Sequence, residues 1–103
     1  MDPNHMSWHR LTLLHHMAIA GELAKARLLL DHGADIDPID LEYQSTPLGV
    51  AVRAGQRALV ALLLERGADP NAAGATWARP LTWARKRGHA DLAATLVRSG
   101  ATE

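Results

Sequence analysis

Histidine is the residue type in this chain that could most readily bind a metal ion, and six histidines are present. His15 and His16 are adjacent, so on a helix their side chains would point in different directions. His32 and His89 fall near expected helix ends, and no carboxylate stands at a spacing from a histidine that is typical of a zinc or iron site. We therefore expect neither a metal ion nor a cofactor.

Nucleophilic catalysis also lacks its usual residues. The chain contains no cysteine, and its serines are Ser7, Ser45 and Ser99. None of these serines lies in the glycine-flanked turn that presents a catalytic serine, and no glycine-rich loop is spaced to cradle a phosphate. We therefore expect a protein that is not an enzyme.

Charge is distributed unevenly along the chain, although the formal net charge is zero. Residues 1–42 carry seven acidic and three basic side chains, whereas residues 43–103 carry four acidic and eight basic ones. A solvated surface is the simplest interpretation, and a second is an acidic partner that docks toward the C-terminal end. The minor alternative is nucleic-acid binding by a basic group in the last third of the chain: Arg79, Arg85, Lys86, Arg87 and Arg98.

The elements that must position these side chains form an internal repeat. Gly21, Gly55 and Gly88 stand 34 and 33 residues apart, and a second set of glycines has the same spacing. That second set is Gly33, Gly67 and Gly100. A period of this length is typical of stacked repeats, in which each unit buries its apolar surface against its neighbours.

The sequence of each unit predicts two short helices. Thr46 suits a helix N-cap, and Pro47 and Pro80 suit the first helical position, where the missing N–H costs nothing. The glycines of both sets are placed to end helices in the left-handed conformation. We therefore predict first helices at residues 13–20, 47–54 and 80–87, and second helices at residues 23–31, 57–65 and 90–98.

The middle unit resembles the ankyrin repeat, whose pattern is T-P-L-H-x-A-x-x-x-G followed by V, L-L and G-A-D. The chain has Thr46-Pro47-Leu48-Gly49-Val50-Ala51, then Gly55, Val60, Leu63-Leu64 and Gly67-Ala68-Asp69. The resemblance covers residues 8–102 and implies an all-α ankyrin-repeat solenoid of three helix–turn–helix repeats with short β-turn-like fingers. The run from Ser45 to Gly49 is similar to bacterial ankyrin-repeat proteins.

The same resemblance sets the expected domain organisation. We expect an ankyrin-repeat domain at residues 7–103, with repeats at about residues 8–40, 41–74 and 75–103. Residues 1–6 match nothing downstream, and we expect them to be left from a cloning site.

Two features depart from the ankyrin pattern. The motif histidine, which in the family ties the repeat loop through hydrogen bonds, is present as His15 but is replaced by Gly49 and Thr82. We expect two such ties to be lost. The turn glycine is replaced by Gln44 in one loop and by Trp77 in the other, so we expect both fingers to be non-standard.

Polar residues at positions that are apolar in the middle repeat predict a stack that is closed at both ends. Lys25 stands where the middle repeat has Leu59, and Thr95 stands where it has Leu62. Terminal repeats need such residues because no neighbour covers them. We expect Trp8 to cover the first repeat.

The resemblance also implies that a partner binds through the loop tips and the inner face of the first helices. We expect Tyr43, Arg53 and Trp77 to form one contiguous surface, because aromatic and arginine side chains dominate many interfaces. Trp83 lies inside a helix in register with Val50, so we expect it in the core. The expected partner contacts are Ile39, Leu41, Glu42, Tyr43, Ser45, Arg53, Trp77, Lys86 and Arg87.

Together these features predict a non-catalytic module that binds a protein partner of unknown identity. The alternative is a structural scaffold or spacer with no dedicated partner, either engineered or excised from a longer ankyrin array. No apolar run approaches the roughly 20 residues that span a bilayer, and no signal peptide is visible. We therefore expect a cytoplasmic monomer without membrane association.

Overall fold

The computed structural model describes residues 12–102, which fold into six α-helices and one short 3-10 turn. The helices pair as α1 (Leu13–Ala20) with α2 (Leu23–Asp31), α3 (Pro47–Ala54) with α4 (Arg57–Glu65), and α5 (Pro80–Lys86) with α6 (Ala90–Arg98). These bounds confirm the predicted helices to within one residue.

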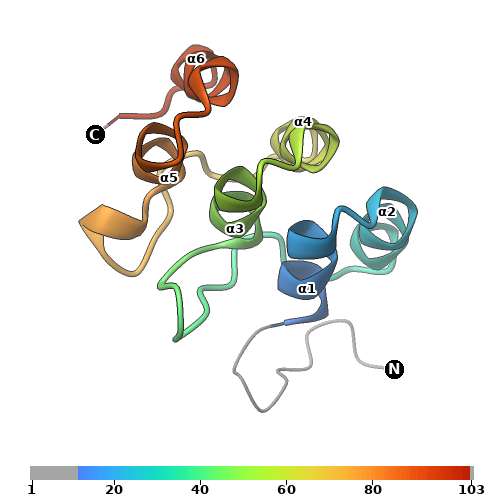
Figure 1. Cartoon of the computed structure of the whole chain (residues 1–103). Coiled ribbons are helices and arrows are strands. Elements are labelled where there is room, and N and C mark those ends of the chain that lie inside the picture. The colour runs from blue at the N-terminus through green and yellow to red at the C-terminus, as the bar shows by residue number, and fades with distance from the viewer. Residues whose placement is uncertain (1–11, 103) are drawn as a thin grey trace.

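The three helical hairpins stack side by side in chain order (Figure 1). The first helices form one row, in which α1 packs on α3 and α3 packs on α5, while α2 packs on α4 in a second row. The connections between hairpins project from the row of first helices as two loops (Figure 1). We call residues 39–45 the first finger and residues 73–79 the second finger.

Local sequence explains where the helices begin and end. The side-chain oxygens of Thr12 and Thr46 each accept a backbone hydrogen bond of 3.2 Å, from His15 and Gly49. Each threonine thereby satisfies a donor that the helix itself leaves unpaired. Arg79 takes the same place in the third repeat without a side-chain cap. All six glycines assigned to helix ends have positive φ, from 71° to 100°, which confirms that prediction.

The glycines that end α1 and α3 also let the next repeat approach closely. Gln56 lies against Gly21 and donates from Nε2 to the Ile19 carbonyl at 3.0 Å. His89 takes the equivalent place against Gly55, where an added Cβ would come within 3.2 Å of its ring. A side chain at either glycine would therefore have to displace a side chain of the neighbouring repeat.

The core runs along the stack between the two rows of helices. Leu14, Leu48 and Leu81 occupy the same repeat position, and each is at most 2% exposed. The middle repeat is the most enclosed, because α4 is buried on more than one face at Leu59, Val60, Leu62 and Leu63. A helix of nine residues is too short to be stable alone, so burial between its neighbours must supply its stability.

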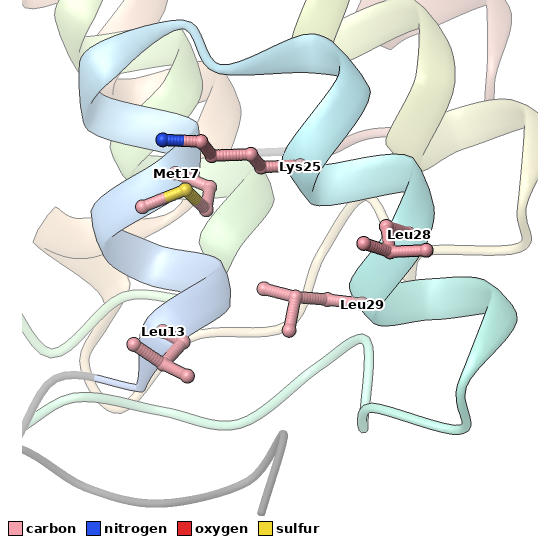
Figure 2. Close-up of a pocket in the computed structure, with 5 residues that line it drawn as sticks. All are labelled: Leu13, Met17, Lys25, Leu28 and Leu29. Atoms are coloured by element: carbon pink, nitrogen blue, oxygen red, sulfur yellow. The ribbon is translucent and has the colours of Figure 1, made fainter. Parts of the chain in front are cut away.

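Within residues 12–102, the N-terminal end of the stack presents an apolar groove. A groove of about 340 Å³ between α1 and α2 is lined by Leu13, Met17, Lys25, Leu28 and Leu29 (Figure 2). Leu28 is 57% exposed, whereas Leu62, at the same position of the middle repeat, is 4% exposed. Within residues 12–102, Lys25 alone therefore does not cover the apolar side chains at this end. Trp8, which was expected to cover this face, lies outside the described residues.

Candidate partner-binding surface

Asp40 organises the backbone of the first finger. It is fully buried, and its carboxylate accepts hydrogen bonds from the backbone N–H groups of Tyr43 and Ser45. The Asp40 N–H also donates to the Ser45 carbonyl at 3.0 Å, which closes the turn. Gln44 consequently adopts a φ of +52°, in the left-handed region that glycine prefers. The expectation that Gln44 occupies a glycine position is confirmed.

His15 joins the first repeat to the first finger. It is fully buried, with Nε2 2.8 Å from the Ser45 carbonyl oxygen and Nδ1 2.8 Å from Thr12 Oγ1. Since a carbonyl oxygen can only accept, the arrangement requires Nε2 to carry the proton and Nδ1 to accept. Burial lowers the pKa of His15 below its ordinary value, although the Ser45 carbonyl and the Asp40 carboxylate oppose the shift. The ring is therefore neutral at pH 7.

Ser45 links the second and third repeats by hydrogen bonds, as His15 links the first and second. We call such a hydrogen-bonded link a tie. Its hydroxyl lies 3.1 Å from the carbonyl oxygen of Ala78, which stands 33 residues later, and 2.9 Å from that of Tyr43. The indole Nε1 of Trp83 donates to the same hydroxyl at 2.8 Å. Gly49 leaves room for this arrangement, because a Cβ there would come within 3.0 Å of the Ser45 Cβ.

The expectation that both histidine ties would be lost is thus wrong for the second repeat. Ser45 and Trp83 together replace the missing ring. In the third repeat, Thr82 donates from Oγ1 to the Thr76 carbonyl at 3.2 Å, so its hydrogen bond stays within its own repeat.

The second finger contains a 3-10 turn, η1 (Thr76–Ala78), which agrees with the expectation that this finger is non-standard. Trp77 lies at the centre of this turn, and 46% of its surface is exposed. The two fingers are joined, because the Gly74 N–H donates to the Gln44 carbonyl at 2.7 Å and Ser45 forms an antiparallel bridge with Ala73. The fingers therefore form one preorganised surface.

Five side chains from the fingers and the first helices are in contact, and we call them the aromatic–cationic patch: Tyr43, Arg53, Trp77, Trp83 and Lys86. The guanidinium carbon of Arg53 lies 4.7 Å from the Tyr43 ring centre and 5.4 Å from the Trp83 ring centre. Nζ of Lys86 lies 5.5 Å from the Trp83 ring and 5.8 Å from the Trp77 ring. The two indoles meet edge to face, with ring centres 6.2 Å apart.

The cations of the patch are held by aromatic rings rather than by acids. Cations over aromatic faces are attracted by the ring quadrupole, at about 0.5–1 kcal/mol each in exposed settings. Within residues 12–102, neither Arg53 nor Lys86 forms an ion pair with a carboxylate. Nε of Arg53 is also buried without a hydrogen-bond partner in this range. The patch therefore presents two positioned but unneutralised positive charges.

The structure places the other expected contact residues differently. Leu41 and Ile39 are 52% and 40% exposed on the first finger, and Glu42 and Arg87 are also exposed. Ser45, in contrast, is fully buried, so its expected role as a partner contact is wrong and it acts as a support for the patch.

Trp83 was expected in the core, but it is only partly buried and lies at the centre of the patch. It connects Arg53 with Lys86 and Trp77. One sequence signal could have revealed this position, because Trp83 precedes Lys86 by three residues, a spacing that puts two side chains on the same helix face.

Residues 12–102 contain no group of three or more histidine or acidic side chains that could hold a metal ion. No helix in this range is long and apolar enough to cross a membrane.

Comparison with known proteins identifies the family. The model of the family described as ankyrin repeats (3 copies) matches residues 1–73. The chain is 40% identical over 95 residues to the B-cell lymphoma 3 protein homolog of Mus musculus, which covers 92% of this chain and 21% of that protein. It is 38% identical over 84 residues to the ARF GTPase-activating protein GIT1 of Homo sapiens, covering 82% of this chain and 11% of that protein. The chain thus spans about a fifth or less of these relatives. It belongs to the ankyrin-repeat family.

Proposed function

We propose that this chain binds a protein partner through the aromatic–cationic patch, together with the exposed residues Ile39, Leu41, Glu42 and Arg87. Ankyrin repeats are in general protein–protein interaction modules built on a non-catalytic fold. The observation that carries the proposal is Trp77, a large aromatic side chain that is 46% exposed yet held against Trp83 and Lys86. Such positioned aromatic side chains contribute strongly to binding, because they bury a large area.

Preorganisation of the two fingers supports the same proposal. The backbone contacts between the fingers and the buried Asp40 and Ser45 hold the first finger in one conformation. Binding to a rigid surface costs less conformational entropy than binding to a mobile loop. Leu41 and Ile39 extend the surface with apolar area that is exposed in the described part of the chain.

The test is a selection of binders from a random-sequence peptide library displayed on phage. Peptides selected on the wild-type chain should lose at least about tenfold in affinity when Trp77→Ala is introduced. Leu28→Ala is the matched control, because Leu28 is also a large exposed side chain but lies on α2 in the N-terminal groove. Binding should be unchanged in that control, and both variants should melt within a few degrees of the wild type.

A spacer without a dedicated partner gives a different outcome. In that case no selected peptide would depend on Trp77 or Leu41, and the proposal would be abandoned. It would also be abandoned if Trp77→Ala unfolded the chain, because Trp77 would then be a structural residue.

A further inference from the structure

We propose that the aromatic–cationic patch receives an acidic peptide segment of the partner, with Asp or Glu carboxylates placed against Arg53 and Lys86. This inference rests on the proposed function and specifies the chemistry of the partner.

Arg53 is the first observation that points to a carboxylate. Its guanidinium lies against the rings of Tyr43 and Trp83 and forms no ion pair within residues 12–102, where its buried Nε also has no hydrogen-bond partner. Aromatic rings cover the flat faces of a guanidinium and leave its N–H groups directed outward in the plane. A carboxylate binds in that plane through two parallel hydrogen bonds. The aromatic contacts have already paid the entropy cost of ordering the side chain.

Lys86 adds a second positive charge to the same surface. Its Nζ and the guanidinium of Arg53 both lie within 5.5 Å of the centre of the Trp83 ring. No described carboxylate pairs with either charge, so their mutual repulsion is relieved only by solvent or by an anion. An acidic segment would neutralise both charges while covering the indoles of Trp77 and Trp83.

The surroundings of the patch give the acidic segment a direction. Arg87 is exposed at the end of α5, whereas Glu42 is exposed on the first finger beside the apolar Leu41. Acidic residues of the partner are therefore favoured toward α5, and an apolar residue is favoured toward the first finger.

A peptide carboxylate fits the molecule better than a nucleic-acid phosphate does. Proteins that bind nucleic acid carry an extended basic surface and a high isoelectric point. This chain has a formal net charge of zero and an isoelectric point near 7.0, so its positive charge is local. Arg53 is also only partly exposed, which suits a single carboxylate better than a continuous phosphate backbone.

The experiment uses the same displayed random-peptide library and reads the composition of the bound pool. Peptides selected on the wild-type chain should be enriched in Asp and Glu. One selected peptide should then lose at least about tenfold in affinity in an Arg53→Gln/Lys86→Gln variant, and equally when its own acids become Asn and Gln. Arg27→Gln is the matched control, because it removes the same charge from the exposed surface of α2 and should change affinity by less than about twofold.

Lys86→Gln alone keeps the test decisive if replacing Arg53 disturbs folding, because Lys86 is exposed on α5. A bound pool that depends on Trp77 but contains no excess of acids overturns the carboxylate proposal and leaves the proposed function standing. A pool whose binding does not depend on Trp77 contradicts both the carboxylate proposal and the proposed function. A single-stranded oligonucleotide that binds more tightly than the selected peptide, and that loses this binding in the Arg53→Gln/Lys86→Gln variant, would show that the patch is a nucleic-acid surface. That result would also overturn the proposal.

Discussion

Replacing Ser45 with alanine should weaken the junction between the second and third repeats. The side chain is fully buried, and its hydroxyl contacts the carbonyl oxygens of Tyr43 and Ala78 and the indole N–H of Trp83. Alanine fits the same space, so the substitution removes hydrogen bonds without adding a steric clash. It therefore isolates the contribution of the tie that stands in for a histidine.

The expected loss follows from the groups that Ser45→Ala leaves without a partner. A buried polar group deprived of its hydrogen bond costs about 1–3 kcal/mol, and the carbonyl of Ala78 belongs to a residue that is 0% exposed. Trp83 is only partly buried, so its N–H can turn to water at a smaller cost. We expect the free energy of unfolding to fall by about 2 kcal/mol, with a decrease in Tm of about 10 °C for a chain of this size.

The assay is urea unfolding followed by circular dichroism, with the slope m unchanged between variants. Ser99→Ala is the matched control, because its hydroxyl donates to the Thr95 carbonyl at the exposed end of α6. That change should cost less than about 0.5 kcal/mol. Combining Ser45→Ala with Trp83→Phe should cost less than the two single changes added together, by about 0.5 kcal/mol or more. Equal midpoints for Ser45→Ala and Ser99→Ala would refute the tie.

Three further predictions test other parts of the structure. Burial lowers the pKa of His15, so as the pH falls below about 6.5 the unfolded chain takes up a proton before the folded chain does. The contribution of His15 to the free energy of unfolding should therefore be constant above that pH and decrease below it. His15→Gln should flatten the dependence of the urea midpoint between about pH 8 and pH 5, and an unchanged slope would contradict the assignment. Gln44→Gly should raise the free energy of unfolding by up to about 1 kcal/mol, since it relieves a left-handed φ of +52°. A lower urea midpoint would show that the contacts of the glutamine side chain stabilise the fold by more than the backbone strain destabilises it. Leu62→Ala should lower the free energy of unfolding by about 2–4 kcal/mol, and Leu28→Ala should lower it by less than about 1 kcal/mol. The two leucines share a repeat position, but Leu62 is 4% exposed and Leu28 is 57% exposed. Thermal unfolding measures both losses, and equal losses would mean that the N-terminal groove is covered.

Much of the fold could be predicted from the sequence because its signals are local. Pro47, Thr46 and Gly55 start and end α3 through the conformations that each residue can adopt, independently of the rest of the chain. The same signals recur at a fixed period, so the helices and the stacking of the repeats follow from them. The ankyrin resemblance placed Gln44 at a turn position that glycine usually holds, and the structure supplied its left-handed φ.

The candidate surface could be predicted only in part. Tyr43, Arg53 and Trp77 were expected to be contiguous from their repeat positions, and the structure joins them through Trp83 and Lys86. The burial of Ser45 could not be predicted, because it depends on contacts with the third repeat, and the partial exposure of Trp83 was indicated only by its spacing from Lys86.

By itself, then, the sequence of this protein determined the helices, their ends and the order in which the repeats stack, since each depends on residues close together in the chain. The tertiary structure decided which side chain takes the place of the missing histidine and which aromatic ring the cations meet. Ser45 reaches Ala78 across 33 positions, and Trp83 reaches Ser45 across 38. Gly49 leaves room for the Ser45 side chain within the second repeat, and the hydrogen bonds to Ala78 and Trp83 form only once the second and third repeats are packed together.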